Sequence, residues 1–60
     1  MKTNKDTIRE HLEYHLLSTH QEGNVSLWNL MGYCIGYYGS IDMDVMEAIM
    51  ELYKEGWVHD

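Results

Sequence analysis

The segment from Gly23 to Ile41 contains no charged side chain, although Glu22 and Asp42 flank it directly. Such a segment can cross a membrane, fill a hydrophobic core or contact another chain. A transmembrane helix needs about 20 predominantly apolar residues, whereas glycine, serine, asparagine and tyrosine interrupt the apolar residues of this run. We therefore expect the segment to be buried on one side by its own chain and on the other by a second chain, outside any membrane.

The length of the chain limits how much apolar surface it can bury. A domain of 60 residues buries only about 60% of the surface that its unfolded form exposes. Small domains therefore often depend on a disulfide, a metal or association. Cys34 is the only cysteine, which excludes an internal disulfide and is typical of a reducing compartment. Because 45% of the residues are hydrophobic, we predict one domain, residues 1–60, that forms a homodimer.

Charge is distributed unevenly along the chain. Three basic residues and Asp6 leave the first nine residues at +2, and nine acidic residues with Lys54 leave the remainder at −8, which together give −6. An acidic body repels phosphate backbones, so the charge argues against nonspecific nucleic-acid binding. It favours a solvated surface that maintains solubility, or a face that meets a basic partner. The start MKTNKDTIREH is charged where a signal peptide is apolar, so we expect a cytoplasmic protein.

Hydrophobic spacing and glycine positions predict a mainly α-helical fold with three short helices, at about residues 5–20, 26–38 and 43–55. The first helix has Thr3 or Asn4 as a candidate N-cap and Gly23 as a candidate left-handed residue beyond its end. Its apolar stripe has helical spacing and consists of Ile8, Leu12, Leu16 and Thr19, joined by His15.

The third helix is strongly amphipathic. Asp44 and Glu47 have the spacing of a capping box, Asp42 is a competing N-cap, and Gly56 follows the last turn. Its polar face carries Glu47, Glu51, Lys54 and Glu55, and its apolar face carries Val45, Met46, Ile49, Met50, Leu52 and Tyr53.

The middle helix has Ser26 as its N-cap and Gly39 as its end. At 100° per residue one side gathers Leu27, Leu30, Met31, Cys34, Ile35 and Tyr38, and the other gathers Asn29, Gly32 and Gly36. Each interior glycine costs a helix about 1 kcal/mol relative to alanine, so we expect another backbone to approach along this notch. A short strand near 24–28 or 57–60 is the alternative local structure.

Methionine and aromatic residues predict a contact surface. Methionine adapts to irregular partners, and tryptophan and tyrosine are common interface anchors. A chain this short cannot easily hide all of its large apolar side chains. We predict that the contact surface comprises Trp28, Met31, Gly32, Ile35, Gly36, Met46, Met50, Tyr53 and Trp57. Gly32→Leu should then disrupt association more than Glu51→Ala.

Few residues indicate site chemistry. His11 and His15 share a helical face and could bind a metal if His20, His59 or Cys34 completed the site. They could equally form a pH-sensitive interface, because unperturbed histidine titrates near pH 6.5. Cys34 has no basic neighbour in sequence, which indicates an inert buried thiol. No carboxylate pair or other catalytic motif is recognisable, so we expect neither enzymatic activity nor a cofactor.

The stretch SLWNLMGYCIGYYGSIDMDVMEAIMELYKEGWVHD resembles the second helix, turn, third helix and first wing strand of a winged helix-turn-helix domain. The ending LYKEGWV is similar to the close of a recognition helix. This resemblance implies a DNA-binding regulator that reads DNA with basic and amide side chains of the third helix. The matching positions here are Glu47, Glu51 and Glu55, with Lys54 alone positive. Acidic positions favour protein contact there.

In its small size, acidity and lack of enzyme motifs, the chain also resembles early accessory proteins of temperate bacteriophages. Those proteins commonly bind a host or phage regulatory protein, which implies a location in the host cytoplasm. We therefore predict a non-catalytic regulatory protein that acts as an intertwined or packed homodimer and binds a further, unidentified protein. The alternatives are a winged-helix DNA-binding regulator and a metal-binding module that uses His11 and His15.

Overall fold

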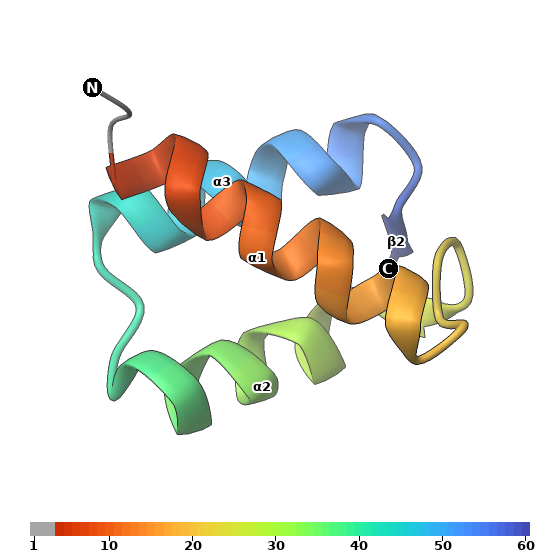
Figure 1. Cartoon of the computed structure of the whole chain (residues 1–60), viewed down its shortest axis with the longest axis horizontal. Helices are drawn as coiled ribbons and strands as arrows, with labels where there is room; N and C mark the ends of the chain where they lie inside the picture. The colour runs from red at the N-terminus through yellow and green to blue at the C-terminus, as the bar shows by residue number, and fades with distance from the viewer. Residues whose placement is uncertain (1–3) are drawn as a thin grey trace.

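Three helices and two very short strands make up the fold of residues 4–60 (Figure 1). The computed structural model describes residues 4–60, so the N-cap expected at Thr3 lies outside the described residues. The order is α1 (Asn4–Ser18), β1 (Val25–Ser26), α2 (Leu27–Tyr38), α3 (Met43–Lys54) and β2 (Val58–His59). The predicted three-helix, mainly α fold is confirmed. No helix among residues 4–60 is long and apolar enough to span a bilayer.

The two strands form a parallel pair in which Val25 lies opposite Val58 and Ser26 lies opposite His59. The sequence offered strands at these two places as alternatives, and both are present because each supplies the other's hydrogen-bonding partner. The pair brings the turn after α1 to the turn after α3. Gly23 reinforces this link, because its N–H donates to the carbonyl oxygen of Trp57 at 2.7 Å.

The core lies chiefly between α1 and α3, which pack directly against each other, and α2 closes it from a third side (Figure 1). The predicted stripe of α1 is buried at Ile8, Leu12 and Leu16, but Thr19 is exposed and lies beyond the end of the helix. Ala48 was absent from the predicted apolar face of α3, yet it is fully buried. Within residues 4–60, the core consists of Ile8, Leu12, Leu16, Val25, Leu30, Cys34, Val45, Ala48, Ile49, Leu52 and Val58.

Local sequence signals set most helix ends. The Ser26 side chain accepts a hydrogen bond from the Asn29 N–H at 3.1 Å, which caps α2 as expected. Gly39 ends α2 with a φ of 85°, and Gly56 has a φ of 91° in the turn that ends α3. The N-cap of α3 is Asp42, which accepts from the Val45 N–H at 2.9 Å. The capping box at Asp44 is therefore wrong, because α3 already begins at Met43.

The end of α1 differs from the prediction. The helix stops at Ser18, and the first left-handed residue is His20, with a φ of 58°, two residues after that end. The His20 N–H donates to the Leu17 carbonyl, and the Gln21 N–H donates to the Leu16 carbonyl. This pair of bonds is the Schellman motif, which usually places glycine at the left-handed position. Gly23 also has a positive φ, of 77°, but it serves the contact with Trp57.

Candidate functional site

One side of α2 faces away from the core and forms the α2 outer face, which we define as Trp28, Gly32, Ile35 and Gly36. Trp28 is 75% exposed and Ile35 is 52% exposed. A Cβ atom added at Gly32 or Gly36 would meet no other atom within 4 Å. Because Trp28, Gly32 and Gly36 are spaced by four residues, they lie in one row along the helix. Within this chain, the predicted glycine notch is therefore open.

The predicted contact residues divide into two groups. The α2 outer face is exposed, whereas Met31 and the members from α3 and its exit are half-buried. Four of these half-buried side chains pack against the core, namely Met31, Met50, Tyr53 and Trp57. The fifth half-buried member of the predicted surface is Met46. Ile35 differs from the helical-wheel expectation that grouped it with the inner side of α2, because half of its side chain reaches solvent.

Large apolar side chains outside the predicted surface are also exposed. They are Tyr14, Leu17, Tyr37 and Met43. Tyr14 and Leu17 fall off the stripe formed by Ile8, Leu12 and Leu16, so helical periodicity could have identified them. Both residues lie on α1 and not on α2. The exposed fraction of Tyr14, 72%, is close to that of Trp28, and the exposed fraction of Leu17, 51%, is close to that of Ile35.

The acidic row of α3 is engaged by α1. Arg9 Nη1 donates to Glu51 Oε1 at 2.9 Å, the Arg9 guanidinium also contacts Glu55, and Arg9 Nε donates to Glu13 Oε2 at 2.6 Å. Lys5 Nζ donates to Glu51 Oε2 at 2.8 Å. Hydrogen bonds from Lys5 and then Arg9 lower the pKa of Glu51, and a hydrogen bond from Arg9 lowers the pKa of Glu55.

These ion pairs involve residues at the positions that the winged-helix resemblance assigns to DNA recognition. Glu47, Glu51 and Glu55 are the positions at which that family would read DNA. In this structure Glu51 and Glu55 bind α1 side chains, and Glu47 is exposed. Lys5 and Arg9 therefore partly neutralise the acidic residues of the body, although the sequence places the two signs of charge in separate regions.

Rings from α1 and α2 meet along a line that we call the histidine–tyrosine seam, which comprises His11, His15, Tyr33, Tyr37 and Tyr38. The His15 ring is stacked on Tyr33, with centroids 3.8 Å apart and an interplanar angle of 11°. His11 Nδ1 lies 2.6 Å from the Tyr38 hydroxyl, and its Nε2 lies 2.9 Å from the Tyr33 hydroxyl. His11 also contacts the ring of Tyr37 at a centroid distance of 4.3 Å.

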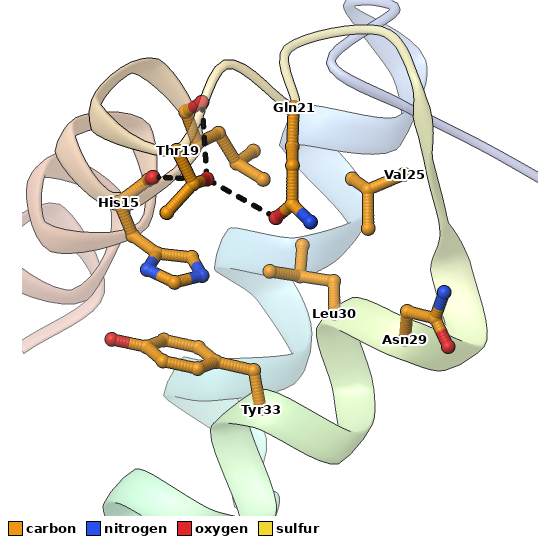
Figure 2. Close-up of a pocket in the computed structure, with 8 residues that line it drawn as sticks. His15, Thr19, Gln21, Val25, Asn29, Leu30 and Tyr33 are labelled. Carbon is orange, nitrogen blue, oxygen red and sulfur yellow. Dashed lines mark hydrogen bonds between the residues drawn. The ribbon is translucent and has the colours of Figure 1, made fainter.

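A hollow of about 390 Å³ lies beside this seam, between the end of α1, β1 and the start of α2. Figure 2 shows the imidazole of His15 over the ring of Tyr33 and the carboxamide of Gln21 reaching into the hollow above Leu30. The Thr19 hydroxyl lies 2.8 Å from the His15 carbonyl oxygen and 3.1 Å from Gln21 Oε1. The lining thus combines an apolar floor with polar hydrogen-bonding groups at the rim.

The structure does not bring the proposed metal ligands together. Across residues 4–60, no three histidine, cysteine or acidic side chains are close enough to hold a metal ion. Both ring nitrogens of His11 are already occupied by tyrosine hydroxyls. Cys34 is fully buried, and this burial raises the pKa of its thiol to about 11. The thiol therefore stays protonated at neutral pH, which is the inert state that its apolar sequence context indicated.

Comparisons of the chain with protein-family models, with curated proteins and with solved structures found no match.

Proposed function

We propose that this protein is a non-catalytic binding protein that acts as a homodimer through the α2 outer face. The observation that carries the proposal is the exposure of Trp28 and Ile35 beside two glycines whose outer sides are open. An exposed tryptophan next to a backbone notch is an arrangement that a second helix can cover closely. Covering it removes apolar surface from water, which is the main driving force of association.

The α2 outer face is complementary to itself. Symmetric dimers use the same patch on both copies. If residue i of one copy contacts residue j of the other, then residue j of the first copy also contacts residue i of the second. If a two-fold axis passes beside Gly32, two antiparallel copies of α2 place Trp28 of each copy opposite Gly36 of its partner. The bulky indole then fills the space left by the missing Cβ. The two Gly32 residues meet at the axis, where the backbones come closest.

Charge also supports a second copy as the partner of this face. Each chain carries a net charge of −6, and α2 contains no acidic or basic side chain. Two acidic molecules repel least where they meet through an uncharged surface. The α2 outer face is such a surface, because the charged residues of the chain lie before Gly23 and after Ile41.

We extend the proposal to a regulatory role for the dimer in the cytoplasm, in the manner of the early accessory proteins of temperate bacteriophages. Small size and acidic composition support this part. The half-buried group of Met46, Met50, Tyr53 and Trp57 is the proposed contact for a further protein, because methionine and aromatic side chains suit such contacts.

Matched substitutions test the dimer. Trp28→Ala is paired with Tyr14→Ala, and Ile35→Ala is paired with Leu17→Ala, because the members of each pair have similar exposure on different helices. Loss of an interface anchor costs about 2 kcal/mol, or roughly thirty-fold in the dissociation constant. We expect Trp28→Ala to weaken the dimer by this amount and Ile35→Ala to weaken it less, while both α1 variants dimerise normally. Gly32→Leu, which fills the notch, should abolish association.

Sedimentation equilibrium between about 1 and 200 μM spans the range of weak to moderate dimers. A monomeric wild-type protein throughout this range would refute the proposal, as would equal effects within each matched pair. Fluorescence anisotropy with random duplex DNA at low salt separates it from the winged-helix alternative. A DNA reader gives salt-sensitive binding, whereas the proposed protein binder gives none.

A further inference from the structure

The connection between α1 and α2 is made by side chains alone. No Cα atom of α1 lies within 8 Å of a Cα atom of α2, whereas α1 packs closely on α3. On the inner side the gap is filled by core residues such as Leu30 and Cys34. On the outer side it is filled by the histidine–tyrosine seam. These five rings therefore form the outer part of the contact between α1 and α2.

The hydrogen bonds of His11 suit only the neutral imidazole well. A neutral ring has one N–H and one acceptor nitrogen, so it accepts from one tyrosine hydroxyl and donates to the other. A protonated ring has two N–H donors. The hydroxyl that donated must then turn its hydrogen away and find another acceptor. Protonation thus reverses one of the two bonds, at 2.6 Å and 2.9 Å, that join His11 to Tyr38 and Tyr33, and the hydrogen of that tyrosine hydroxyl loses its ring-nitrogen acceptor.

The groups around His11 offer little compensation for a positive charge. Its neighbour on α1 is His15, one turn away, and like charges at this spacing destabilise a helix. From α2 it meets the rings of Tyr33, Tyr37 and Tyr38. Asp42 lies near Tyr38 at the second hollow of the surface, but its carboxylate caps α3. On the other flank of α1, Glu51 and Glu55 bind Lys5 and Arg9.

We propose that the histidine–tyrosine seam is an acid-sensitive latch, in which protonation of His11 loosens α2 from the α1–α3 pair. Burial, and then the charge of His15, lowers the pKa of His11 below its ordinary value of 6.5, which agrees with a seam built for the neutral ring. A histidine with a lowered pKa in the folded state contributes stability in full above pH 6.5. That contribution is lost as the pH falls from 6.5 toward the lowered value.

Amide hydrogen exchange measured by NMR on the wild-type chain at pH 7.5 and pH 5.0 tests the latch directly. After correction for intrinsic exchange rates, we expect protection of α2 amides to fall about tenfold for each unit by which the pKa of His11 is lowered. Protection at the α1–α3 contact should change much less. Glu51 and Glu55, whose pKa values are lowered by Lys5 and Arg9, remain charged over this range. An equal change in all three helices, or no change in α2, would overturn the latch.

Substitutions test whether the loss of α2 protection at low pH arises from the histidines of the seam. His11→Gln with His15→Phe keeps a hydrogen-bonding group and a ring but cannot acquire charge, so the pH difference in α2 protection should disappear. His20→Asn with His59→Gln removes two exposed histidines outside the seam and should preserve it. A pH difference that persists in the seam variant and disappears in the control variant would refute the proposal. If the seam variant fails to fold, the wild-type measurement alone decides. The latch does not depend on the proposed dimer, since exchange reports on α2 in either state.

Discussion

His20 shows how a single residue departs from its usual preference. Its φ of 58° places a branched, ring-bearing side chain in the left-handed region. That conformation costs an L-residue about 1–2 kcal/mol, and glycine adopts it freely. The Schellman bonds at Gln21 and His20 hold the residue there, because they satisfy the last carbonyl groups of α1.

We predict that His20→Gly stabilises the protein. Relief of the backbone strain should outweigh the greater entropy of glycine in the unfolded chain, with a net gain of about 0.5 kcal/mol. Urea unfolding at pH 7 measures the change. His20→Ala is the control, because it removes the imidazole and keeps the strained Cβ. If the alanine variant were as stable as the glycine variant, the imidazole and not the backbone would be the cause.

At the scale of elements, the contact between α1 and α3 combines an apolar core with an ion-pair network. Ala48 of α3 is fully buried and belongs to this core. Arg9 joins Glu51 of α3 and Glu55, which follows α3, to Glu13 of its own helix. Because such pairs are partly solvated, they contribute less to stability than the buried side chains do. They do make the contact depend on pH.

We predict that acid weakens the α1–α3 contact through these carboxylates. The pKa values of Glu51 and Glu55 are lowered in the folded protein, so their contribution is present above the ordinary value of 4.5 and is lost as the pH falls below it. Arg9→Met should reduce the loss of unfolding free energy that occurs as the pH falls through this range. Urea unfolding between pH 6 and pH 3 measures it, and Lys54→Met is the control cation on the exposed side of α3. Equal profiles for wild type and Arg9→Met would contradict the prediction.

At the scale of the whole molecule, a net charge of −6 on 60 residues opposes any contact between copies. Salt screens this repulsion, with a Debye length of about 10 Å at 0.1 M and about 3 Å at 1 M. An interface made of uncharged α2 residues has no ion pairs of its own to lose. The proposed dimer should therefore become tighter as salt is added.

We predict that the dissociation constant of the dimer falls several-fold between about 0.02 M and 0.5 M NaCl, over which the Debye length shrinks to a few ångströms. Sedimentation equilibrium at several salt concentrations measures this. Glu22→Gln with Glu47→Gln, which removes two exposed charges, should tighten the dimer at low salt and flatten its salt dependence. Weaker association at high salt would show instead that ion pairs cross the interface.

Signals that act within a few residues were readable from the sequence. Ser26 and Gly39 mark the two ends of α2, and Gly56 lies in the turn after α3. These signals are readable because a side-chain cap or a left-handed glycine acts on its own turn of helix. Helical spacing predicted the buried residues Ile8, Leu12 and Leu16 of α1, but it placed Ile35 on the inner side of α2, where the structure does not bury it. The contact-surface prediction stays a prediction, and its member Trp28 is exposed in the single chain, since a helix with one inner side must present its other side to solvent or to a partner.

Only the tertiary structure decided features that depend on which elements meet. It selected Asp42 over Asp44 as a cap, placed His20 in the left-handed position, and paired two strands that each had seemed an alternative to the other. It turned Glu51 from a solvated position into a partner of Arg9, and it used both nitrogens of His11 in the seam. Periodicity reports which side of a helix is apolar. It does not report what lies opposite each polar side chain, because that is set by the packing of α1 against α3 and α2.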